Sequence, residues 1–152
     1  MIENKQITKH FSFYELTTTA NTDYLEKNRQ YGFENMDKVV SLAHFAEQVR
    51  SILGVPMIVT SGGRCPELNK AINGSPTSQH FLWEAIDFIP KNMSVAEAFD
   101  LIRGSNLQFG QLILERAGIK EWVHISMPGN RSKERQNMVL IYLDGKYTQV
   151  KR

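Results

Sequence analysis

The spacing of apolar and polar residues predicts helices mainly in the first half of the chain and strands mainly in the second. Between residues 35 and 53, apolar positions recur every three or four residues, and Gly54 follows where a helix commonly ends. The segment 94–104 opens with a Ser-x-x-Glu capping box and ends at a glycine, so it also predicts a helix. Shorter helices are predicted after Ser12 and from about Pro66 to just before Gly74.

Runs of β-branched and other apolar residues predict strands, and these runs are residues 57–61, 85–89, 111–115, 122–126 and 138–143. Asp144-Gly145 is a strong hairpin signal that joins the last run to residues 146–150. Residues 17–35 are polar, and we expect them to be irregular. Early helices followed by late strands favour an α+β fold, with an antiparallel sheet and packed helices, over a single domain of residues 1–152.

Composition narrows the classes of protein that this chain can belong to. It has 152 residues and a formal net charge of +2, so we expect no nucleic-acid partner. The mean hydropathy of -0.35 and the lack of an apolar run near 18 residues predict no membrane insertion. Cys65 is the single cysteine, which excludes an internal disulfide. The N-terminal residues are polar and lack the apolar segment of a signal peptide, so we expect the protein to be made in the cytoplasm.

Two of the four histidines have neighbours that suggest metal chemistry. His80 precedes Asp87 by seven residues, and His124 follows Glu121 by three. Imidazole and carboxylate groups both bind Zn²⁺, and three protein ligands leave a catalytic zinc with an open position. The alternative from spacing alone is that His80 and Asp87 form a hydrogen-bonded pair and His124 packs in the core.

These residues also resemble the M15 zinc peptidases, which include D-alanyl-D-alanine carboxypeptidases and related peptidoglycan peptidases. That family carries Ser-Gly-Tyr-Arg, then Ser-x-His with an Asp seven residues after the His, then Glu-x-x-His near a Trp. The matching segments here are residues 61–64, 78–87 and 121–124. The resemblance implies the fold that these peptidases share with the hedgehog signalling domain.

The resemblance also implies a role for each matching residue. His80, Asp87 and His124 would bind one Zn²⁺ per chain. Glu121 would act as general base for a zinc-activated water. Substrate binding is implied for Arg64, near the scissile carbonyl or a carboxylate, and for Ser78, by a hydrogen bond to the peptide.

Two features of the sequence complicate these roles. In a regular strand, Glu121 and His124 would lie on opposite faces, so we expect Glu121 to lie in the turn before the strand or at a bulge. Glu115, at the end of the preceding strand, is the alternative base. Gly63 stands where the family has Tyr, and Trp83 where it has Gly. We expect Trp83 either to refill the space beside Gly63 and line the substrate cleft, or to reflect drift in a tolerant loop.

The resemblance therefore implies a zinc metallopeptidase, a hydrolase whose partners are peptidoglycan peptides. It would act as a D-Ala-D-Ala carboxypeptidase or as an endopeptidase, and we expect it to be a monomer. The alternative is a non-catalytic, metal-binding recognition or structural module, such as a phage structural component. A third hypothesis is a peptidase for ordinary L-peptides. A cell-wall substrate would require release or another export route, as for a phage endolysin.

Overall fold

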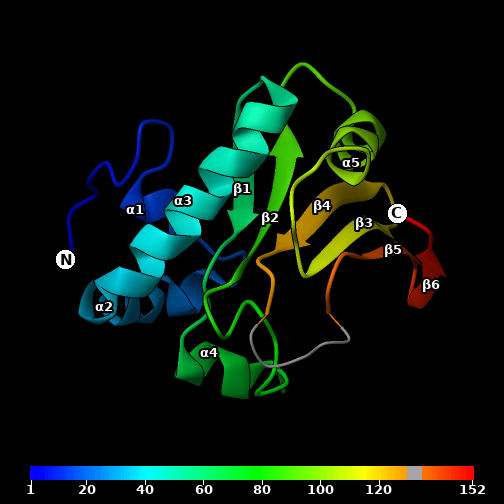
Figure 1. Cartoon of the computed structure of the whole chain (residues 1–152). Coiled ribbons are helices and arrows are strands. Elements are labelled where there is room, and N and C mark those ends of the chain that lie inside the picture. The colour runs from blue at the N-terminus through cyan, green and yellow to red at the C-terminus, as the bar shows by residue number, and fades with distance from the viewer. Residues whose placement is uncertain (130–134) are drawn as a thin grey trace. The chain divides into compact units, whose positions relative to one another are not determined.

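A computed structural model of the chain describes residues 1–129 and 135–152 (Figure 1). The helices in this part of the chain all end before residue 104. They are α1 (Phe13–Leu16), the 3-10 helix η1 (Thr22–Tyr24), α2 (Leu25–Glu34), α3 (Met36–Leu53), α4 (Pro66–Ala71) and α5 (Val95–Arg103). Within the described residues, no helix has both the length and the apolar character that crossing a bilayer requires.

The strands of the described residues form one six-stranded sheet in the order β1-β2-β4-β3-β5-β6. They are β1 (Met57–Ser61), β2 (Ala85–Pro90), β3 (Gln111–Ala117), β4 (Lys120–Ser126), β5 (Met138–Leu143) and β6 (Lys146–Val150). The α+β class predicted from the sequence is confirmed. The sheet is mixed, however, because β3 pairs with β5 in parallel and with β4 in antiparallel orientation. Strand β5 starts beside the start of β3, where Met138 pairs with Gln111, so the two strands run in the same direction.

The segment of residues 17–35, expected to be irregular, contains η1 and all of α2, so that expectation was wrong. The helix is polar, and Asn28 is one of its buried residues. The Asn28 side chain donates hydrogen bonds to the carbonyl oxygens of Thr17 and Gly63 and accepts one from the Cys65 amide. Buried polar contacts therefore hold α2 in place, and an apolar stripe could not have revealed it.

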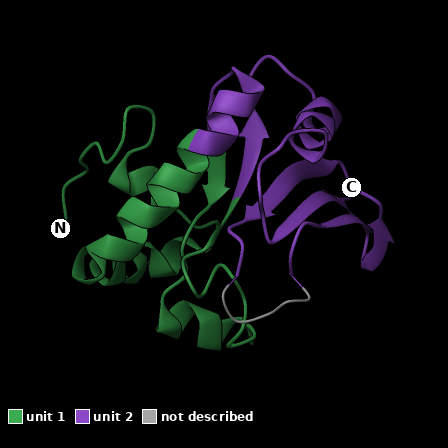
Figure 2. Cartoon of the chain, in the orientation of Figure 1, with its two compact units in different colours: residues 1–47, 59–86 green, residues 48–58, 87–152 purple. Residues whose placement is uncertain are grey.

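The chain divides into two compact units, coloured green and purple in Figure 2. The first unit comprises residues 1–47 and 59–86, and the second comprises residues 48–58 and 87–152. The core of the first unit is largely aromatic and aliphatic and includes Phe11, Phe13, Leu16, Val39, Leu42, Leu68 and Trp83. The single domain of residues 1–152 stays a prediction.

In the second unit, the register of β3 and β4 sorts side chains onto two faces. Leu112 pairs with Ile125 and Leu114 with Val123, and all four are buried. They share one face because side chains alternate along a strand. Helix α5 contacts both strands, and its buried residues are Val95, Ala98, Phe99 and Ile102. The other face of these strands carries His124 and several polar and aromatic residues.

The predicted hairpin joins β5 to β6. Asp144 has a φ of 42° and Gly145 a φ of 98°. Two successive residues with positive φ are what a type I′ turn requires, and its twist matches the twist of the paired strands. This turn fixes the register in which Tyr142 pairs with Tyr147.

We expect Gly145→Ala to destabilise the protein by about 1–2 kcal/mol, because a side chain disfavours the left-handed backbone. A Cβ at Gly145 would meet nothing within 4 Å, so the loss would come from the backbone alone. Urea unfolding of the variant measures it. Gly104→Ala is the matched control, since Gly104 has a φ of -82° and its Cβ would meet only the Asp100 carbonyl at 3.4 Å. Equal losses in both variants would contradict the prediction.

Candidate metal and peptidase site

Asp87 and His124 form the part of the site that lies within the second unit. Asp87 lies in the middle of β2, and His124 lies in β4. Asp87 Oδ1 is 2.9 Å from His124 Nδ1, and both side chains are largely buried. The sequence did not anticipate this contact between Asp87 and His124, and the pairing of His80 with Asp87 that spacing alone suggested stays a prediction. A carboxylate and an imidazole at this distance are hydrogen-bonded, and both groups are also common metal ligands.

His80 lies in the first unit, where the backbone fixes its ring. The residue is buried, and its Nδ1 lies 2.8 Å from the Gly62 carbonyl oxygen. A carbonyl can only accept, so Nδ1 carries a proton, and in the neutral ring Nε2 then has the free lone pair. This is the arrangement in which a metal-binding histidine donates its second nitrogen to a carbonyl, and it fixes the tautomer. The His80 carbonyl in turn accepts from the amides of Arg64 and Trp83.

Donor atoms of His80, Asp87 and His124, one from each residue, all lie within 4.8 Å of one another. Two imidazole nitrogens and one carboxylate oxygen are a donor set found in catalytic zinc sites. Together with the tautomer of His80, this chemistry fits a zinc ion. The three residues could therefore hold the metal that the sequence predicted for them.

Arg64 and Ser78, predicted to bind substrate, lie together in the first unit. Arg64 Nη1 is 3.1 Å from Asn69 Oδ1 and 3.4 Å from Ser78 Oγ. The Asn69 amide nitrogen donates to the carbonyls of Gly74 and Ser75, which fixes the acceptor beside the guanidinium. Sequence reasoning missed Asn69, because a lone asparagine in a short helix has many structural uses.

The expected position of Glu121 was wrong. Glu121 lies inside the regular strand β4, not in a turn before it, and no bulge interrupts its pairing with Arg116 of β3. Its Oε2 accepts a hydrogen bond of 2.7 Å from Arg116 Nε, and both side chains are substantially exposed. Because Glu121 and His124 are an odd number of positions apart, they lie on opposite faces of the strand.

Glu115, the alternative base, lies on the face of His124. Glu115 pairs with Trp122, and Ile113 pairs with His124. Two side chains related in this diagonal way have Cα atoms about 7–8 Å apart, within reach of a long side chain. Glu115 is half-buried at the end of the apolar stretch of β3. Glu115 therefore places a carboxylate on the same face as His124, one of the candidate metal ligands of the second unit.

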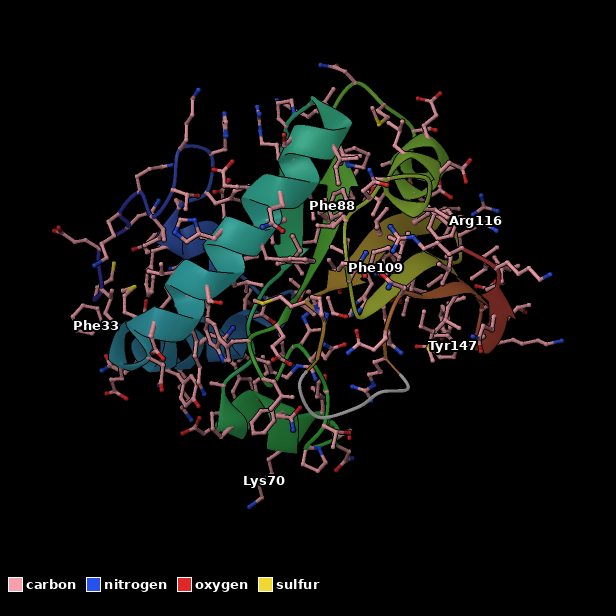
Figure 3. The ribbon with its side chains drawn as sticks, in the orientation of Figure 1. Phe33, Lys70, Phe88, Phe109, Arg116 and Tyr147 are labelled. Atoms are coloured by element: carbon pink, nitrogen blue, oxygen red, sulfur yellow. The ribbon has the colours of Figure 1, made fainter. Side chains whose placement is uncertain are left out.

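Aromatic residues extend the row of Glu115 across the sheet. Glu115 pairs with Tyr142, and Tyr142 pairs with Tyr147, so the row reads Trp122, Glu115, Tyr142, Tyr147 from β4 to β6. The two tyrosine rings are 4.6 Å apart between centroids. Figure 3 labels Tyr147 on β6 and Arg116 on β3. Partial burial raises the pKa of the Tyr147 phenol, and the negative charges of Glu115 and Asp87 raise it further.

Trp83 fills the space beside Gly63, as one of the two sequence interpretations expected. A Cβ placed on Gly63 would lie 2.0 Å from the indole Cδ2. The indole also stacks on Tyr31, with ring centroids 5.8 Å apart. The side chain is only 1% exposed, however. It therefore has almost no surface for direct contact with a peptide, and any part in substrate binding must act through the residues around it.

Cys65 has a structural role in the first unit. It is buried at the start of α4, and burial raises the pKa of its thiol, which therefore stays neutral at pH 7. The Asn28 side chain that holds the Cys65 amide also holds the Gly63 carbonyl. Asn28 thus supports the loop that carries Arg64, and sequence reasoning missed it together with α2.

Comparison with known proteins agrees with the chemistry of these residues. A sequence model of the family described as Peptidase M15 matches residues 9–126, which cover β1, β2 and all of β3 and β4. No curated protein matches the chain. M15 peptidases are zinc-dependent hydrolases, and the matched segment contains His80, Asp87 and His124. The chain belongs to the peptidase M15 family.

Proposed function

We propose that this protein is a zinc-dependent peptidase that hydrolyses peptide bonds in the stem peptides of peptidoglycan. The observation that supports the proposal best is the set of converging donors from His80, Asp87 and His124, together with a carboxylate on the face of His124. Three protein ligands and a nearby acid or base are the groups that a catalytic zinc site uses to hydrolyse an amide.

A zinc ion bound by these three residues would polarise the scissile carbonyl and favour ionisation of a water at neutral pH. Glu115 is our candidate for the general base, in place of Glu121. Its carboxylate would accept the proton of the attacking water and deliver it to the nitrogen of the leaving amine. We favour Glu115 because the register of β3 and β4 places it on the same face as His124. Glu121 lies on the opposite face and binds Arg116.

Arg64 and Ser78 are the candidate substrate-binding residues. A guanidinium presents several N–H donors in a planar fork, which suits the carboxylate of a peptide or a developing oxyanion. Asn69 occupies one of these donors and keeps Nη1 beside the Ser78 hydroxyl. Both side chains would thus reach the peptide from a pre-oriented position, which lowers the entropy cost of binding.

Digestion of purified muropeptides, followed by mass spectrometry, tests the substrate and identifies the bond. Loss of a terminal D-Ala would define a carboxypeptidase, and a cut inside the stem would define an endopeptidase. Parallel assays on D-Ala-containing and all-L peptides separate this function from that of an ordinary peptidase. Zinc binding with no cleavage of any of these substrates would contradict the proposal and favour a recognition module.

We expect one zinc ion per chain, which is lost in His80→Ala, Asp87→Asn and His124→Ala. Each change removes one of three donors, so that the remaining two hold the metal weakly. Metal analysis after dialysis against a weak chelator measures the zinc content. His44→Ala is the matched control, because His44 is an exposed histidine of α3. If a ligand variant kept the zinc content of the wild type, that residue would not belong to the site.

Glu115→Gln should keep zinc but lower kcat by about 10²–10⁴-fold, because glutamine preserves shape and loses the basic oxygen. Glu121→Gln should change kcat by no more than a few-fold, since it weakens one exposed ion pair with Arg116. Steady-state kinetics on the best muropeptide, with zinc content measured in parallel, compares the two variants. A larger loss in Glu121→Gln would contradict the assignment of Glu115.

A further inference from the structure

Trp83 has a backbone conformation that is costly for its side chain. Its φ is 61°, in the left-handed region that bulky residues rarely adopt. Such strain persists only where surrounding contacts over-determine the conformation, and it clusters at functional sites. Trp83 is also the largest of the fully buried side chains among the described residues. The packing of the indole therefore holds the backbone of residue 83 in place.

That packing is specific to a few neighbours of the first unit. The ring occupies the position where Gly63 would carry a side chain, with the indole Cδ2 and Cε3 atoms 2.0 and 2.1 Å from a built Cβ. Its far edge reaches Gly32, where a Cβ would lie 3.1 Å from Cη2. Tyr31 stacks on it. Among the described residues, the indole Nε1 has no hydrogen-bond partner, so the ring contributes volume and not a donor.

The backbone of Trp83 is tied directly to His80. The Trp83 amide donates a 3.1 Å hydrogen bond to the His80 carbonyl, which also accepts from the Arg64 amide at 3.0 Å. The His80 ring is held by the carbonyl of Gly62, next to the glycine on which the indole packs. The tight turn from His80 to Trp83 and the loop of residues 62–64 are thus connected at both the backbone and the indole.

We propose that Trp83 is a positioning residue for His80: the indole, seated in the space left by Gly63, fixes the turn that presents His80 Nε2 to a metal ion. This inference rests on the proposed zinc site and goes beyond it. Trp83 makes no metal contact in this account. Its effect is on the geometry and affinity of metal binding, through the orientation of His80 and the spacing between the turn and the loop of residues 62–64.

The test is the zinc affinity of Trp83 variants, measured by competition with a chromophoric chelator. Trp83→Ala should weaken zinc binding by about 10–100-fold, the range typical of residues that orient a ligand. Trp83→Phe should retain affinity within a few-fold, because the indole N–H is not used. The visible spectrum of bound Co²⁺ should change in Trp83→Ala and not in Trp83→Phe, since it reports the ligand geometry.

Phe11→Ala controls for loss of stability, because Phe11 is another fully buried aromatic of the first unit. It should lower the melting temperature and leave zinc affinity unchanged. Trp83→Gly separates strain from packing: glycine relieves the positive φ, so the variant should be more stable than Trp83→Ala yet bind zinc equally weakly. If Trp83→Ala bound zinc like the wild type, or Phe11→Ala lost as much affinity, the proposal would be overturned.

Gly63→Ala provides a second measurement if Trp83→Ala fails to fold. Its methyl group must displace the indole, so zinc affinity should fall while Trp83 remains in the chain. Combined with Trp83→Leu, whose smaller side chain leaves room for the methyl, Gly63→Ala should cost much less than it does alone. Additive losses would overturn the proposal. If the wild type itself bound no zinc, the proposed function would fail, which is a distinct result.

Discussion

The antiparallel register between β3 and β4 determines which side chains of these two strands lie on the same face as His124. Pairing Ile113 with His124 places Glu115 on the face of His124 and Glu121 on the face of the apolar core. A slip of one residue would move every side chain of a strand to the opposite face. Because Leu112, Leu114, Val123 and Ile125 are all buried on one face, such a slip would expose the core. Core packing therefore also determines which carboxylate shares the face of His124.

In the first unit the backbone has the corresponding role. His80 is oriented by the carbonyl of Gly62 and by the amides that its own carbonyl accepts. Arg64 follows directly in the same loop, which Asn28 holds from α2. Because main-chain groups hold the His80 ring, its orientation depends on the path of the loop and not on the identity of one partner side chain. The residues that control this path are accordingly the buried Asn28 and the aromatic Trp83, neither of which carries chemistry itself.

The sequence was sufficient for elements whose pattern is local. The periodic apolar residues of α3, the β-branched run of β1 and the Asp144-Gly145 turn each predicted the element that the structure contains. It was insufficient for α2, whose anchoring contacts are polar and made with residues far along the chain. It also missed the parallel pairing of β3 with β5, because strand order is set by contacts that no local pattern records.

The two metal-site motifs differ in how far spacing alone can be trusted. His80 and Asp87 are joined by a turn and the start of β2, so their separation along the chain limits their separation in space. Glu121 and His124 lie in one extended strand, where a separation of three places side chains on opposite faces; in a helix the same separation would place them together. A motif therefore carries geometric meaning only with its secondary structure. Here the strand turns the carboxylate that matches the motif toward Arg116, and the neighbouring strand supplies another on the face of His124.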